Sequence, residues 1–97
     1  MTPETILKKQ IKDYLNLRRY FWWYNLAGIG AQKGIPDIFI LHNGKLFGVE
    51  VKAPKGKISE YQEKFLADIE RSGGIAVIPR KLEELIEILK KHLEPPK

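Results

Sequence analysis

The chain contains no cysteine and only two histidines among its 97 residues. The absence of cysteine excludes disulfide bonds and thiolate metal sites, and it favours a reducing compartment. No apolar stretch approaches the roughly 18 residues of a membrane span, and the N-terminal MTPETILKKQ lacks the apolar core of a signal peptide. We therefore expect a cytoplasmic protein in which residues 1–97 form one domain, because a chain of this length has little room for a second core.

Basic residues outnumber acidic ones, with 17 Lys and Arg against 12 Asp and Glu, a net charge of +5 and a pI near 9.5. This balance favours an anionic partner, nucleic acid first. Solvated lysine faces give many small proteins the same balance, so the charge alone leaves both interpretations open.

Helix and turn signals divide the chain into seven elements in the order α-β-β-β-α-β-α. Thr2 can cap a first helix that has Pro3 at its first position and continues to about Arg19. A second helix begins after Ser59 and reaches about Ser72. The expected strands are residues 20–26, 38–41, 46–52 and 75–78, and a last helix carries an apolar stripe over residues 82–93.

The pair Asn43-Gly44 is a strong hairpin signal between the second and third strands. The strand-helix-strand step over residues 46–78 predicts a right-handed crossover that leaves its two strands parallel. Together these features predict an α/β fold with a small mixed sheet flanked by helices.

Three charged residues stand where a sheet needs apolar surface: Asp37, Glu50 and Lys52. Side chains alternate along a strand, so Glu50 and Lys52 point the same way, which a half-exposed strand with a polar face would also explain. Hairpin pairing in which residue numbers sum to roughly 87 places Asp37 opposite Glu50. Two carboxylates so placed repel each other unless a cation lies between them, and an all-oxygen site suits Mg²⁺ or Mn²⁺ rather than zinc.

A third acid, Glu4, projects from the buried stripe of the first helix. At about 100° per residue it lies within about 20° of Ile11 and Leu15. Compensation of the helix dipole in the first turn explains the same residue equally well, so both interpretations stay open.

Three segments together resemble the VRR-NUC branch of the PD-(D/E)xK nuclease superfamily: GIPD at 34–37, GVEVKAPKGKIS at 48–59, and Gln62. The resemblance covers nearly the whole chain. It implies a restriction-endonuclease-like core and a phosphodiesterase that uses Mg²⁺ or Mn²⁺ on DNA. Small stand-alone members, from bacteria and their phages, are similar to resolvases that act as homodimers on four-way (Holliday) junctions. Larger relatives are structure-specific repair nucleases.

The motif match also implies a role for each residue of the site. Asp37 and Glu50 would be metal ligands together with the backbone carbonyl of Val51, and Glu4 would hold the metal directly or through water. Lys52 would orient or activate the attacking water and stabilise charge on the phosphate.

Gln62 has two explanations. The resemblance implies that it contacts or positions the lysine end of the site. The segment from Ser59 to Gln62 also fits the S-x-x-Q capping box, in which the glutamine reaches back to the backbone of the cap residue.

Several further residues are candidates for contact with DNA. The glycine-rich loop at 27–34 has neither the dinucleotide-binding nor the Walker spacing, but its glycines would let a DNA backbone approach. The aromatic run at 20–26 could stack on bases, although we expect Trp22 and Trp23 to lie in the core. Arg18 and Arg19 lie at the surface near the site or serve as helix-end charges. The candidate DNA-binding residues are Lys33, Lys55, Lys57, Arg18 and Arg19.

The alternatives to a junction-resolving nuclease are a flap or single-strand nuclease of DNA repair, a non-catalytic DNA-binding module, and a structural domain with solvated charges. Retention of Asp37, Glu50 and Lys52 together favours a nuclease over the last two, because a non-catalytic copy has no chemical reason to keep all three.

Overall fold

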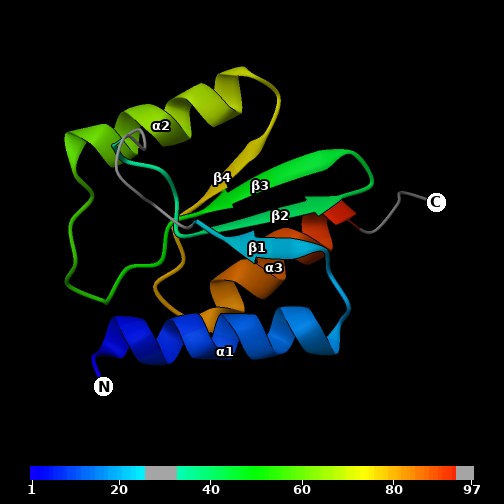
Figure 1. Ribbon diagram of the computed structural model, residues 1–97, viewed down its shortest axis with the longest axis horizontal. Coiled ribbons are helices and arrows are strands. Elements are labelled where there is room, and N and C mark those ends of the chain that lie inside the picture. The colour runs from blue at the N-terminus through cyan, green and yellow to red at the C-terminus, as the bar shows by residue number, and fades with distance from the viewer. Residues whose placement is uncertain (26–32, 94–97) are drawn as a thin grey trace.

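The expected order of elements is confirmed in a computed structural model, which describes residues 1–25 and 33–93 (Figure 1). A four-stranded sheet has the order β1-β2-β3-β4, with β1 and β3 antiparallel to β2 and with β4 parallel to β3. The elements are α1 (Pro3–Leu17), β1 (Trp22–Tyr24), β2 (Ile38–His42), β3 (Lys45–Val49), α2 (Glu60–Arg71), β4 (Ile75–Val77) and α3 (Leu82–Leu93). The prediction of a small mixed sheet flanked by helices is therefore confirmed.

The hairpin between β2 and β3 has the predicted register. Its pairs run from Ile38 opposite Val49 to His42 opposite Lys45. Asn43 and Gly44 both have positive φ, 51° and 79°, as a two-residue turn that matches the twist of the strands requires. This register brings Asp37 and Glu50 to the same end of the sheet.

The third strand ends at Val49, earlier than the predicted residue 52. Beyond Val49 the chain still bonds to the β4 side, because Glu50 N donates to Val77 O and Lys52 N donates to Pro79 O. On the β2 side the backbone ladder stops, since Val51 N donates to the Asp37 side chain instead, at 2.9 Å. The side-chain carboxylate of Asp37 thus takes the place of a backbone acceptor on the neighbouring strand.

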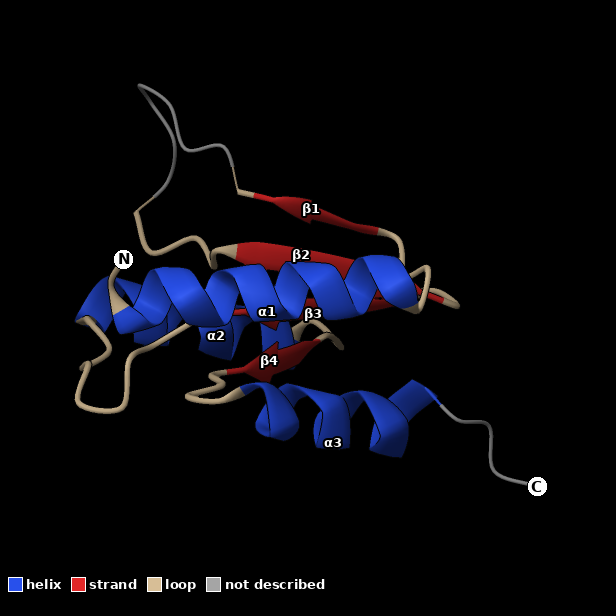
Figure 2. Ribbon diagram, turned by 90° about the horizontal axis from the view of Figure 1, so that it is seen from below, coloured by secondary structure: helices blue, strands red, loops and turns tan. Residues whose placement is uncertain are grey.

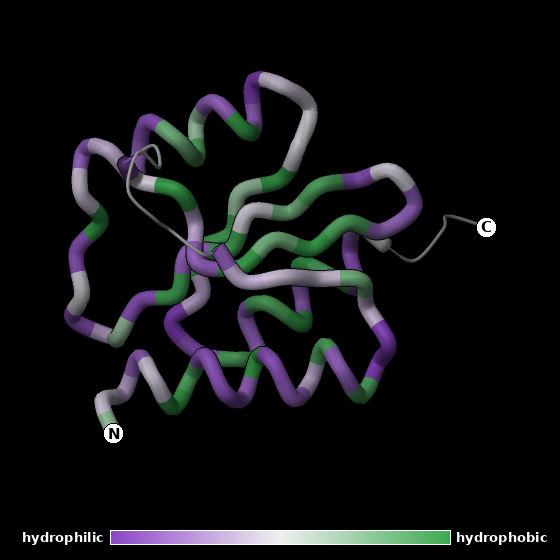
Figure 3. The backbone as a smooth tube through the Cα atoms, in the orientation of Figure 1, coloured by the Kyte–Doolittle hydropathy of each residue, from purple (hydrophilic) through white to green (hydrophobic). Residues whose placement is uncertain are grey.

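Helices cover both faces of the sheet (Figure 2). The helices α1 and α3 lie on one face and α2 lies on the other. Between α1, α3 and the sheet, the buried core comprises Leu7, Ile11, Leu15, Ile38, Ile40, Phe47, Val49, Val51, Val77, Leu85 and Leu89. Figure 3 shows the hydrophobic residues concentrated along the central strands. Phe47, Val49 and Val51, which alternation places on the face opposite Glu50 and Lys52, are fully buried.

The first strand is shorter than expected, and its two tryptophans differ. Trp22 packs against the core and its Nε1 donates to Asn16 Oδ1 at 2.8 Å. The prediction that Trp23 is core is wrong, because its side chain is 40% exposed and stacks on Phe39. Since β1 is an edge strand, alternation directs Trp23 to the face opposite α1 and the main core, where it stays exposed. Leu26, at the end of the predicted strand, lies outside the described residues.

The first helix has its expected start, with the Thr2 side chain accepting from Thr5 N at 3.1 Å and Pro3 in the first turn. Among the residues described, no helix is long and apolar enough to cross a membrane.

Candidate metal and nuclease site

Three carboxylates meet at the end of the sheet where β2 begins and β3 ends. Glu4, Asp37 and Glu50 each offer an oxygen atom, and these three atoms lie within 4.8 Å of one another. The first turn of α1 supplies Glu4, the residue before β2 is Asp37, and the residue after β3 is Glu50. The helical phase of α1 and the register of the hairpin therefore bring these three residues together, and we call them the acidic cluster.

Glu50 is the buried member of the acidic cluster, with 2% of its surface exposed. Its Oε2 accepts from Gln62 Nε2 at 3.0 Å and lies 3.7 Å from Lys52 Nζ. Its Oε1 is buried with no hydrogen-bond partner among the described residues. Burial, and then the charge of Asp37, raise the pKa of Glu50 from 4.5 to about 7, although the charge of Lys52 opposes the rise.

A buried carboxylate oxygen without a partner is costly unless something else binds it. The metal-ligating groups that the described residues bring together here are three carboxylates, the oxygen-rich set that Mg²⁺ and Mn²⁺ prefer. The residues present therefore fit a divalent cation, which would complete the coordination of Glu50 Oε1 and neutralise the repulsion among the acids.

Asp37 is fixed by two neighbours. Its Oδ2 accepts from Val51 N, and its Oδ1 lies 3.5 Å from Lys8 Nζ. Lys8 therefore lies beside the acidic cluster, although it is not among the candidate residues expected from the sequence. The spacing in the sequence could have predicted this position, since Lys8 follows Glu4 by four residues and so lies on nearly the same side of α1.

Lys52 lies beside Glu50 with 15% of its side chain exposed, and the loop that follows it is held by Arg80. The Arg80 Nη1 donates to the carbonyl oxygens of Ala53 and Gly56, both at 2.8 Å. Local sequence patterns do not reveal these hydrogen bonds of Arg80, because its partners lie 24 and 27 residues earlier.

Gln62 completes the predicted capping box, and its side chain also contacts Glu50 rather than Lys52. Its Oε1 accepts from Ser59 N at 2.9 Å and its backbone N donates to Ser59 Oγ at 3.1 Å, which completes the capping box. Its Nε2 remains available and donates to Glu50. The cap therefore orients the amide that holds the buried carboxylate.

Gly34 allows the chain that leads to Asp37 to pass against α2. Its φ is +83°, and a Cβ at this position would collide with the carbonyl group of Tyr61. Only glycine fits this conformation and this approach without strain.

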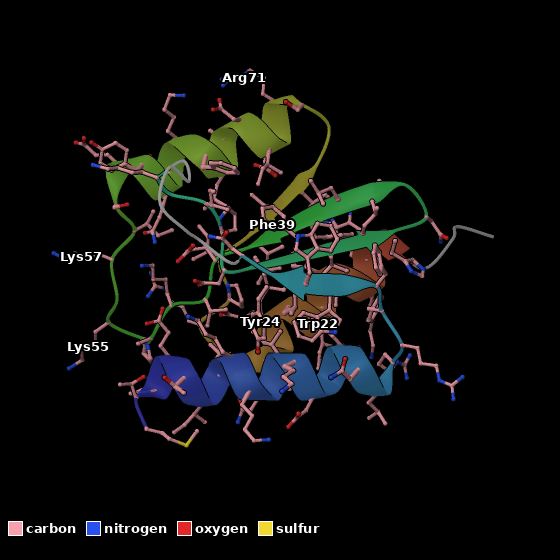
Figure 4. All side chains as sticks on the ribbon, in the orientation of Figure 1. Trp22, Tyr24, Phe39, Lys55, Lys57 and Arg71 are labelled. Carbon is pink, nitrogen blue, oxygen red and sulfur yellow. The ribbon has the colours of Figure 1, made fainter. Side chains whose placement is uncertain are left out.

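The expected DNA-binding residues occupy different places. Lys33 Nζ lies 4.9 Å from the centre of the Tyr61 ring, beside the start of α2. Lys55 and Lys57 are exposed on the loop after Lys52 and point away from the molecule (Figure 4).

Arg18 and Arg19 are not brought to the acidic cluster. Arg18 is the C-cap of α1, about 21 Å along the helix from Glu4 at about 1.5 Å per residue. This position agrees with the helix-end interpretation. Gly28 and Gly30 of the glycine-rich loop lie outside the described residues.

Comparisons with known proteins agree with the geometry. The family described as the VRR-NUC domain matches residues 4–80. Two solved structures are similar to this chain. One, titled "VRR_NUC domain protein", is 16% identical, with 93% of this chain and 87% of that chain covered and a TM-score of 0.74. The other, titled "VRR_NUC domain", is 20% identical, with 97% and 100% covered and a TM-score of 0.76.

A search of the curated proteins finds no significant match. The two structural likenesses show the shared fold, which is compatible with a restriction-endonuclease-like core. Because the family match spans most of the sequence, the chain belongs to the VRR-NUC family of nuclease-type domains that act on DNA.

Proposed function

We propose that residues 1–97 form one nuclease domain, a divalent-metal-dependent DNA endonuclease whose catalytic centre is the acidic cluster. The observation that carries the proposal is the buried, unpartnered Oε1 of Glu50 beside two further carboxylates. A cluster of this kind is destabilising on its own and becomes favourable when a cation binds it.

Asp37, Glu50 and Glu4 would hold the ion through their carboxylates, with the backbone carbonyl of Val51 as a further ligand. When bound, Mg²⁺ or Mn²⁺ supplies Lewis acidity and fixes the geometry for in-line attack on a phosphodiester. The hydrogen bond from Val51 N to Asp37 keeps the two strand ends, and so the ligand atoms, in register.

Lys52 would orient the attacking water and stabilise negative charge on the phosphate. Its ammonium group lies next to Glu50 and is largely buried, so its charge is less screened than that of a surface lysine. Gln62 would act as a positioning residue, because its amide holds Glu50 Oε2 and would leave Oε1 available to an ion.

We further propose that the substrate is branched DNA and that the chain resolves four-way junctions as a homodimer. The support is the resemblance to small stand-alone VRR-NUC nucleases. A resolvase of this kind would act as a dimer, because symmetric resolution needs two catalytic centres and the described residues contain one acidic cluster.

A cleavage panel tests this function. Labelled four-way junction, flap, single strand and linear duplex are incubated with Mg²⁺ or Mn²⁺ and either the wild type or Asp37→Asn. Paired symmetric nicks in the junction alone, absent from the variant, are expected. Cleavage of flaps or single strands would replace the junction as substrate. Binding without cleavage of any substrate would overturn the nuclease and leave a DNA-binding module.

A further inference from the structure

A cleft of about 500 Å³ lies between α1 and the end of β1, directly beside the acidic cluster. Asp37 belongs to both, so the cleft opens onto the proposed catalytic centre. Its other main lining residues come from α1 and from the β1 end of the sheet, and none of them is among the DNA-binding residues expected from the sequence. They are Lys8, Lys9, Lys12, Tyr24 and Asn25.

The cleft is positively charged, because three lysines line it and Asp37 is the acid among its lining residues. Lys9 pairs with Asp13 at 2.9 Å, and Lys8 Nζ lies 3.5 Å from Asp37 Oδ1, on the side of the cleft next to the acidic cluster. Lys8 and Lys12 are one turn apart, about 6 Å along the helix axis, on the flank of α1 that faces the cleft. Two lysine side chains that leave the helix about 6 Å apart can reach neighbouring phosphates of one strand.

Tyr24 forms a rigid wall of the cleft. Its ring meets Trp22 edge-on at 4.9 Å, and Trp22 is in turn fixed by its hydrogen bond to Asn16. Figure 4 shows both aromatic side chains between β1 and α1. A fixed, partly exposed aromatic ring beside a row of lysines is the arrangement by which proteins hold a nucleic-acid strand through its phosphates and its base or sugar faces.

We infer that this cleft binds the DNA strand next to the phosphate that is cleaved, with Lys8 and Lys12 on successive phosphates and Tyr24 against a sugar or base. The inference rests on the proposed nuclease function and adds the path of the substrate. The strand passes between α1 and β1 on one side of the acidic cluster. Lys55 and Lys57 belong to the loop that follows β3 and do not line this cleft.

The test is the salt dependence of DNA binding, measured in EDTA so that neither metal nor cleavage contributes. Fluorescence anisotropy gives the dissociation constant of a labelled single strand and of a labelled four-way junction at several salt concentrations. For Lys8→Gln/Lys12→Gln, two phosphate contacts are lost. The steepness of the plot of log dissociation constant against log salt concentration should then fall by about 1.4 on a single strand and by about 1.8 on duplex arms. Lys12→Gln alone, which leaves the ion pair of Asp37 intact, lowers it by about half as much.

The matched control is Lys90→Gln/Lys91→Gln, which removes the same charge from exposed positions in the last turn of α3. Its slope stays at the wild-type value. Equal slopes for the cleft pair, the control pair and the wild type would overturn the inference.

The two proposals fail in different ways. A wild type that cleaves, an Asp37→Asn variant that does not, and a cleft pair with an unchanged slope would remove the cleft and keep the nuclease. A Tyr24→Ala variant that binds more weakly, beside a Tyr24→Phe variant that does not, further supports the cleft. Equal binding by both tyrosine variants and the wild type would remove Tyr24 from the strand path.

Discussion

The substitution Glu50→Gln should stabilise the metal-free protein at pH 8 and leave its stability unchanged at about pH 4.5. In the folded protein the pKa of Glu50 is about 7, above its ordinary value of 4.5. Between these two pH values the folded state therefore holds a proton that the unfolded state has released. The contribution of Glu50 to the free energy of unfolding is therefore greatest below about pH 4.5, falls as pH rises to about 7 and then levels off. At about 1.4 kcal/mol per pH unit, the loss amounts to about 3 kcal/mol.

Glutamine mimics the protonated carboxyl at this position. It can still accept the hydrogen bond from Gln62 Nε2, and it removes the repulsion from Asp37 and Glu4. The variant should thus lack the part of the pH dependence that Glu50 causes, because every other titrating group is common to both proteins.

Urea unfolding in EDTA at about pH 4.5 and at pH 8 measures the difference directly. We expect the variant to exceed the wild type by up to about 3 kcal/mol at pH 8. Saturating Mg²⁺ should then stabilise the wild type, by about 2.7 kcal/mol at a hundred times the dissociation constant, and should not stabilise the variant. A variant that is less stable than the wild type at pH 8, or that has the same pH dependence, would refute the reasoning.

Three further predictions concern residues around the acidic cluster. Lys52→Ala should reduce kcat by at least about 100-fold and change the dissociation constant for DNA far less, as single-turnover kinetics and anisotropy in EDTA would show; equal losses in both would place Lys52 in binding instead. Arg80→Ala should leave the carbonyls of Ala53 and Gly56 without their donor and lower the free energy of unfolding by about 1–3 kcal/mol. Proteolysis of this loop should also become faster, and an unchanged rate of proteolysis would contradict the proposed role of Arg80 in holding the loop. Gly34→Ala should destabilise the protein by more than about 1 kcal/mol in thermal unfolding, whereas Gly73→Ala, which also has positive φ but meets no neighbour, should cost less; equal costs would rule out the contact with α2.

Local patterns were sufficient to predict the core of the acidic cluster. The turn residues at 43 and 44 determine the hairpin register, and that register alone aligns Asp37 with Glu50. The helical phase of α1 places Glu4 toward the sheet. Both inferences use short-range periodicity, which depends little on the rest of the fold.

The features that escaped prediction depend on tertiary packing. Trp23 is a large apolar residue of the kind usually found in a core, and it is exposed because β1 lies at the edge of the sheet. Arg80 reaches a loop far from it in sequence. β3 ends early because the side chain of Asp37, and not a backbone carbonyl, accepts the hydrogen bond of Val51 N. Strand propensities of single residues do not predict such a contact.

The most direct test of the central claim is Mn²⁺ binding to the DNA-free protein, measured by titration calorimetry at pH 8 for the wild type, Asp37→Asn and Glu50→Gln. The account predicts one class of site in the wild type and loss or strong weakening of that site in each variant, with both variants still folded by circular dichroism. Mn²⁺ binding of equal affinity in all three proteins, or no binding to the wild type at millimolar metal, would contradict it.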